Sequence, residues 1–155
     1  MSVNQPKDLV SDLVKLLLRK AGKKYEPFGS TTFKRDRTAG IEPDACFYIL
    51  NYQCIIGRRH LEHGDPPPDL AIEIDVTSKT TIDTYAVIAV PEVWIYGNGK
   101  LAIYLLQDGQ YIQSDTSPTF PGIPLTQLIP VAVERSWQVG SVQALEEFEA
   151  AIDLL

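Results

Sequence analysis

The stretch "PPDLAIEIDVTSKT", residues 67–80, has the alternating pattern of a strand but carries several charges. Its apolar positions are Leu70, Ile72, Ile74 and Val76. Because side chains of a strand alternate between its two faces, these four residues are expected to bury one face, and Glu73 and Asp75 to share the other. Two neighbouring carboxylates repel each other and lose hydration on burial, so folding alone does not account for them.

The acidic face of this strand indicates either a cation site or an exposed polar surface. Hard divalent cations bind several carboxylate and carbonyl oxygens. The upstream stretch "AGIEPDACFYIL", residues 39–50, supplies Asp44 just before another apolar run, so a second strand is expected to bring it alongside Glu73. The alternative is that Glu73 and Asp75 lie in solvent and pair with lysines. A central strand between a loop and a covering helix disfavours that alternative.

The flanking segments predict an α/β (α+β) fold with a mixed central sheet flanked by helices. Helical spacing of apolar residues predicts helices over 7–22, 77–90 and 141–155. Runs of strand-forming residues bounded by turn residues predict strands over 30–36, 43–50 and 69–76, a hairpin over 92–106 and a further strand within 107–114. Prolines and glycines predict loops at 58–68 and 120–130, the second with only a short helical turn.

The length of the chain favours a single domain, residues 1–155. Its negative net charge does not favour attraction of nucleic acid by the protein as a whole. The chain is 45% hydrophobic and carries a formal net charge of −6. The net charge does not exclude a local basic face, because basic residues cluster along the first part of the chain. They are Lys15, Arg19, Lys20, Lys23, Lys24, Lys34, Arg35 and Arg37, with Arg58 and Arg59 further on. Charge patterning alone favours a solvated helix face instead.

Several features bear on compartment and metal class. No apolar run is long enough to span a bilayer, and the first residues lack a basic-then-apolar signal pattern, so we expect a cytoplasmic protein that does not enter membranes. Cys46 and Cys54 are expected to be small buried thiols. His60 and His63 have no third strong ligand near them, which does not favour a structural zinc site.

Several separated motifs resemble the Uma-two family of the restriction-endonuclease-like PD-(D/E)xK superfamily. The motifs are "EPDACFYI", "PPDLAIEIDVTSKTTIDTYAVIAVPEVWIY", "LLQDGQYIQSDTSPTFPGIPLTQLIP" and the tail "ERSWQVGSVQALEEFE". They occur in the expected order from about Gly29 onward. The resemblance implies a restriction-endonuclease-like core and a divalent-metal-dependent endonuclease that hydrolyses phosphodiester bonds, with Mg²⁺ or Mn²⁺ as cofactor and DNA as partner.

The resemblance also implies roles for individual residues. The PD dipeptide ends at Asp44, which implies a metal ligand, and Glu73 matches the (D/E) position, a second ligand. The main-chain carbonyl of Ile74 is implied as a further ligand. The third position, normally lysine, is Asp75, a departure from the superfamily pattern. Lys79, at the start of the next helix, is the candidate for the missing ammonium, and Asp75 for positioning water.

Other residues that match the family are expected to play supporting parts. Glu42 is a candidate neighbour of the ligands, and Tyr85 and Trp94 are expected to pack rather than react. A second PD dipeptide ends at Asp69. It lies only four residues before Glu73 on the same strand, whereas the motif needs its two acids on neighbouring strands, so Asp69 is not expected to be a ligand.

Two functions from different classes remain open from the sequence. The first is the metal-dependent nuclease, for which a homodimer is plausible because cutting two strands suits a symmetric pair of sites. The second is a catalytically weak or inactive nuclease-fold module that acts in nucleic-acid or protein binding. Asp44, Glu73 and Lys79 favour the first function, whereas Asp75 at the lysine position and the acidic net charge favour the second.

Overall fold

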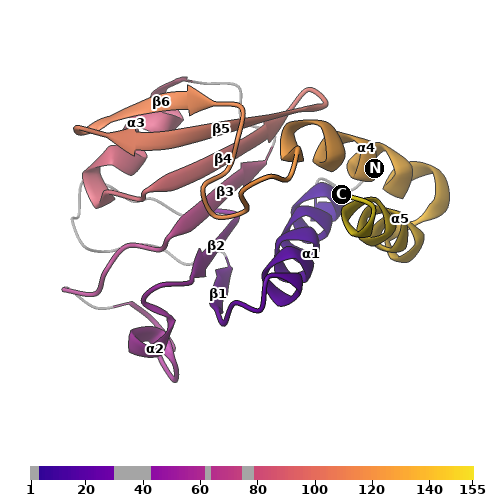
Figure 1. Cartoon of the computed structure of the whole chain (residues 1–155). Helices are drawn as coiled ribbons and strands as arrows, with labels where there is room; N and C mark the ends of the chain where they lie inside the picture. Colours follow the sequence, from indigo (N-terminus) through magenta and orange to yellow (C-terminus); the bar gives the residue numbers. More distant parts are fainter. Residues whose placement is uncertain (1–3, 30–42, 62–63, 75–78) are drawn as a thin grey trace.

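The computed structural model describes residues 4–29, 43–61, 64–74 and 79–155. Figure 1 shows a six-stranded sheet with α1, α4 and α5 on one face and α3 on the other. The helices are α1 (Asn4–Lys20), α2 (Tyr52–Ile55), α3 (Lys79–Ile88), α4 (Leu125–Val139) and α5 (Ser141–Asp153). The strands are β1 (Glu26–Gly29), β2 (Ala45–Tyr48), β3 (Leu70–Ile74), β4 (Glu92–Gly97), β5 (Lys100–Gln107) and β6 (Gln110–Ser114). The predicted fold class is confirmed.

The strands lie in the sheet in the order in which they occur in the chain. Only β3 and β4 are parallel, and every other neighbouring pair is antiparallel. Parallel strands need a crossover connection, and α3 provides it between β3 and β4. This topology places β3 in the interior of the sheet, as the sequence predicted, with β2 antiparallel on one side and β4 parallel on the other.

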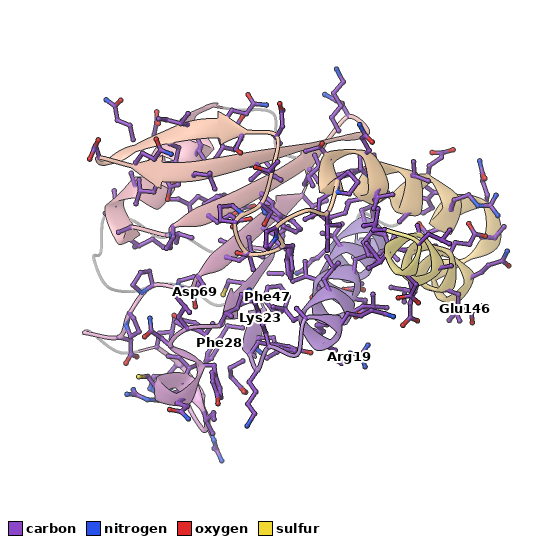
Figure 2. All side chains as sticks on the ribbon, viewed as in Figure 1. Arg19, Lys23, Phe28, Phe47, Asp69 and Glu146 are labelled. Carbon is purple, nitrogen blue, oxygen red and sulfur yellow. The ribbon has the colours of Figure 1, made fainter. Side chains whose placement is uncertain are left out.

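The larger part of the core lies between the sheet and α1, α4 and α5. Leu70, Ile72 and Ile74 of β3 face it, together with buried leucines of α1. Phe47 of β2 is fully buried and lies between the sheet and α1 (Figure 2), where its ring contacts Tyr25 edge-on at 6.1 Å. Burial of this apolar set is the main stabilising contribution on this face.

The other face of β3 packs against α3. Its core includes Cys46, Ala71 and Tyr85, with the remaining buried positions supplied mainly by α3 and by β1, β2 and β4. Residues 71 and 73 point to the same side of the strand because side chains alternate. Glu73 therefore lies on the face that α3 covers, next to apolar side chains.

The two predicted β-turns have the backbone conformation that tight hairpins need. Asn98 and Gly99 have φ values of 52° and 73°, and Asp108 and Gly109 have φ values of 51° and 79°. Positive φ at both central residues is typical of type I′ turns, whose twist matches that of paired strands. The predicted hairpin of β4 and β5 and the following strand β6 are confirmed.

The prediction of a loop over 120–130 is wrong in its second half. A fifteen-residue helix, α4, begins at Leu125 and continues through Pro130. A proline inside a helix removes a backbone hydrogen bond and costs about 3 kcal/mol. Burial of Leu125, Ile129 and Val133 against the core offsets that cost. The prolines and glycines of residues 120–130 predicted a loop with a short helical turn, and the apolar spacing that favours a helix continues beyond that stretch to Val133.

Smaller differences concern short elements and one thiol. β1 and α2 were not predicted, because four residues carry too little periodicity to be recognised. The strand predicted over 30–36 lies outside the described residues. The helix predicted over 77–90 is confirmed as α3, although it ends at Ile88 rather than at Pro91. Cys46 is buried, but Cys54 is exposed, so the expectation of two buried thiols is wrong for Cys54.

Within the described residues, no helix is both long enough and apolar enough to cross a membrane.

Candidate active site

Asp44 and Glu73 come from neighbouring strands and lie side by side. Asp44 directly precedes β2, and Glu73 lies in β3. The antiparallel register pairs Ala45 with Ile72, so the next positions along, residues 44 and 73, lie opposite each other. Both side chains are half-buried, and their carboxyl groups are close enough to share a hydrogen bond. The sequence predicted this juxtaposition of two acids across two strands.

Each carboxyl group is also held by a donor from a different element. The backbone N–H of Ile74 donates to Asp44 Oδ2 at 2.8 Å. The hydroxyl of Tyr85, on α3, donates to Glu73 Oε1. Tyr85 is fully buried, so its hydroxyl needs a partner inside the protein. The two donors fix the orientation of both carboxyl groups before any ligand binds.

The electrostatics of the pair are dominated by burial. Burial, the largest cause, and the neighbouring Asp44 raise the pKa of Glu73, whereas the hydrogen bond from Tyr85 and the charge of Lys7 lower it. Together these effects place the pKa of Glu73 at about 7. Burial and the nearby Glu73 carboxylate raise the pKa of the Tyr85 hydroxyl well above its usual value. Tyr85 therefore remains a hydrogen-bond donor, and the ionised form of the acid pair is unfavourable without a compensating positive charge.

The oxygen atoms of the acid pair are the kind of ligand that a hard divalent cation binds. Asp44 and Glu73 supply carboxylate oxygens, the ligand type that Mg²⁺ and Mn²⁺ prefer, and a cation would relieve the repulsion between them. Ile74 directly follows Glu73 and ends β3, so its main-chain carbonyl is one residue along the chain from this acid. In the part of the chain that the structure describes, no group of three or more histidine, cysteine, aspartate or glutamate side chains surrounds a common point. The main-chain carbonyl of Ile74, water, substrate and residues outside that part are the candidates for further ligands.

Several residues predicted from the sequence fall outside the described part of the chain. Asp75 and Glu42 lie there, as do three of the basic residues clustered in the first part of the chain, Lys34, Arg35 and Arg37, and so does the side chain of Lys79, the first residue of α3. Their predicted roles stay predictions. Arg58 is described, and its guanidinium pairs with the buried Asp65 at 3.2 Å, which gives Arg58 a structural partner.

Asp69, the acid of the second PD dipeptide, has a structural role at the other end of β3. Its Oδ2 accepts hydrogen bonds from the backbone N–H groups of Ile49 and Leu50 at 2.6 and 3.0 Å. These bonds cap the end of β2, where the strand leaves the sheet. The arrangement agrees with the expectation that Asp69 is not a ligand.

Two residues that act on Glu73, Tyr85 and Lys7, were not expected from the sequence to do so. Tyr85 was expected only to pack, but its hydroxyl also holds Glu73. A tyrosine at a helix position between the buried Ile82 and Ile88 was the available signal, since a buried hydroxyl must bond to something. Lys7, near the start of α1, acts electrostatically on Glu73 although it is remote in sequence. No local pattern indicated that contact.

Comparison with known proteins places this geometry in a family. A crystal structure described as a "putative nuclease belonging to DUF820", from Anabaena variabilis ATCC 29413, has a similar fold, with a TM-score of 0.53 and 13% identity over 94% of this chain and 83% of that chain. None of the curated proteins compared with the chain matches it. The model of the family Uma2, described as "Putative restriction endonuclease", matches residues 2–139. Because that match covers most of the chain, this protein belongs to the Uma2 family.

Proposed function

We propose that this protein is a divalent-metal-dependent endonuclease that hydrolyses phosphodiester bonds in DNA, with Asp44 and Glu73 as ligands of Mg²⁺ or Mn²⁺. The observation that carries the proposal is the pairing of these two carboxyl groups across β2 and β3. Membership of a family described as restriction endonucleases supports it. When bound, such a cation polarises a phosphodiester and lowers the pKa of a nearby water.

The surrounding residues have defined parts in this proposal. Ile74 N–H and the Tyr85 hydroxyl hold the two carboxylates in a fixed orientation, as supporting hydrogen bonds do at metal sites generally. The carbonyl of Ile74 is the proposed third ligand. Lys79 is proposed to stabilise negative charge that develops on the phosphate, and Asp75 to position the attacking water. The DNA substrate, the homodimer and the cytoplasmic location stay predictions.

The test is cleavage of plasmid and oligonucleotide DNA by the wild type, Asp44→Asn and Glu73→Gln with Mg²⁺ or Mn²⁺. Both substitutions keep an acceptor for the existing hydrogen bonds but remove a charged ligand. Loss of a supporting group typically costs 10–100-fold, so loss of a ligand is expected to lower the rate by at least about 100-fold. Calorimetric titration of Mn²⁺ into the same variants measures metal binding without relying on a substrate.

The matched control is Asp83→Asn, which removes an exposed carboxylate from α3, the same helix that carries Tyr85. It is expected to cleave DNA and bind Mn²⁺ as the wild type does. The proposal is wrong if neither metal supports cleavage by the wild type, or if Asp44→Asn and Glu73→Gln behave like Asp83→Asn.

A second candidate function is a nuclease-fold module that binds nucleic acid or protein without cutting. Asp75 in place of the usual lysine and the net charge of −6 favour it. Wild type that binds DNA in the presence of a divalent cation, but leaves it intact over long incubation, would support the binding module over the nuclease.

A further inference from the structure

A cavity of about 240 Å³ lies directly beside Asp44. One wall is formed by Lys7, Ser11 and Lys15 of α1, and the opposite wall by β1 and the start of β2. The proposed active-site acid therefore shares a cavity with two lysines and a serine.

The helical repeat explains why these α1 residues line the cavity together. Residues four apart on a helix lie on the same face, so Lys7, Ser11 and Lys15 form one ridge. The adjacent face carries Leu9, Leu13 and Leu17, which are buried in the core and fix the rotation of the helix. All three ridge residues are half-buried, whereas Arg19 on the same helix is exposed. Half-buried lysines pack their aliphatic stems against protein and keep the ammonium group in water, and both lysines line the cavity.

The charge of the ridge complements the acid pair. Lys7 is close enough to Glu73 to lower its pKa. The superfamily position that normally supplies an ammonium is Asp75 in this chain, so positive charge near the pair has to come from elsewhere. Asp8 also lines the cavity, but the two lysines outnumber it, so the α1 wall is net positive.

We propose that the ridge of Lys7, Ser11 and Lys15 binds the sugar-phosphate backbone of one DNA strand, with Lys7 on the phosphate nearest Asp44 and Glu73. The inference rests on the proposed nuclease function and adds to it the surface that holds the substrate. Lys7 and Lys15 are separated by about 12 Å along the helix, at about 1.5 Å per residue. That separation exceeds the axial advance of about 3.4 Å between successive phosphates of one strand, so the two lysines would contact different phosphates. Serine hydroxyls and lysines are common phosphate donors.

The test measures binding of a labelled DNA duplex by fluorescence anisotropy across a range of salt concentrations, with Ca²⁺ as the divalent cation. The variants are Lys7→Gln, Lys15→Gln and the double substitution. Each lost phosphate contact lowers the slope of log K against log salt by about 0.9, so the double variant is expected to lose about 2. Lys7→Arg keeps the charge and is expected to retain the wild-type slope.

The matched control is Lys24→Gln, which removes one exposed positive charge from the segment between α1 and β1. That segment leads into Glu26, which pairs with Tyr48 at the end of β2 opposite Asp44. The slope of this variant is expected to stay within about 0.3 of wild type, well below one contact. Circular dichroism of each variant verifies the fold. The ridge proposal is overturned if the lysine variants keep the wild-type slope or lose no more than Lys24→Gln.

The outcomes separate the ridge from the proposed nuclease function. Metal-dependent cleavage by the wild type, with unchanged DNA binding in the Lys7 and Lys15 variants, would overturn the ridge and leave the nuclease standing. Lysine-dependent DNA binding without cleavage by the wild type would support the ridge and overturn the nuclease. Asp44→Asn is expected to lose cleavage while keeping the salt slope, because it changes a metal ligand and no phosphate contact.

Discussion

Two glutamates on adjacent parallel strands, Glu92 of β4 and Glu73 of β3, lie in very different surroundings. Glu92 is 3% exposed, and its carboxylate accepts hydrogen bonds from Trp94 Nε1 at 2.6 Å and from the hydroxyls of Ser117 and Thr119 at 2.5 and 2.8 Å. Glu73 receives the Tyr85 hydroxyl but faces a second carboxyl group, that of Asp44. Neutral hydrogen-bond donors surround Glu92, whereas Glu73 lies next to a second acid, Asp44.

The difference separates a glutamate whose hydrogen bonds account for its burial from one that is proposed to bind a metal ion. A buried carboxylate that is fully hydrogen-bonded stabilises its surroundings, and Glu92 ties the start of β4 to the segment before α4. A buried carboxylate next to another one is unfavourable unless a cation or a proton compensates it. The divalent cation proposed for Asp44 and Glu73 would compensate the repulsion between these two carboxylates.

The strongest test of this comparison is Glu92→Ala. The substitution removes the acceptor of the buried donors of Trp94 and Ser117 and of the half-buried hydroxyl of Thr119, and each unsatisfied buried donor costs about 1–3 kcal/mol. We expect the free energy of unfolding, measured in urea, to fall by about 3–5 kcal/mol. Glu146→Ala, on the exposed surface of α5 (Figure 2), is the control and should change it by less than about 0.5 kcal/mol. A change below about 1 kcal/mol for Glu92→Ala would contradict the structural role.

An intermediate effect is expected for Asp69, which is half-buried and bonded to two backbone N–H groups. Asp69→Ala should lower the free energy of unfolding by about 1–2 kcal/mol, and Asp69→Asn by less, because the amide oxygen still accepts a hydrogen bond. Since Asp69 is not a proposed ligand, Asp69→Asn should retain metal-dependent cleavage. Loss of cleavage in a folded Asp69→Asn protein would show that the second PD dipeptide belongs to the site.

The smallest expected effect concerns the pH dependence of stability through Glu73. Its pKa in the folded protein, about 7, lies above the ordinary value of 4.5. Its contribution to stability is therefore fully present below pH 4.5 and is lost as the pH rises through 7. In Glu73→Gln this loss disappears, so the fall in unfolding free energy between pH 5 and pH 8 should shrink by about 1 kcal/mol after allowance for solvent screening. Urea unfolding without divalent cations measures it, and an identical fall in both proteins would contradict the raised pKa.

Features that depend on local periodicity could be predicted from the amino-acid sequence. The alternation in β3 predicted which face carries the large apolar side chains, and the Asn98-Gly99 and Asp108-Gly109 turns indicated the hairpins, because only certain residues adopt positive φ readily. For these features the information lies within a few residues of the chain. The juxtaposition of Asp44 and Glu73, which lie far apart in the chain, was expected chiefly from the family resemblance.

Only the tertiary structure decided the features that depend on distant contacts. Pro130 lies inside α4 because burial of the helix outweighs a lost hydrogen bond, which no local rule reveals. Lys7 reaches the acid pair because α1 packs against the sheet, and Glu92 is structural because its donors come from another part of the chain. The sequence shows which residues are acidic or basic. Their roles depend on the groups that folding brings within hydrogen-bonding distance, because those groups determine whether the charged form of a buried side chain is stable.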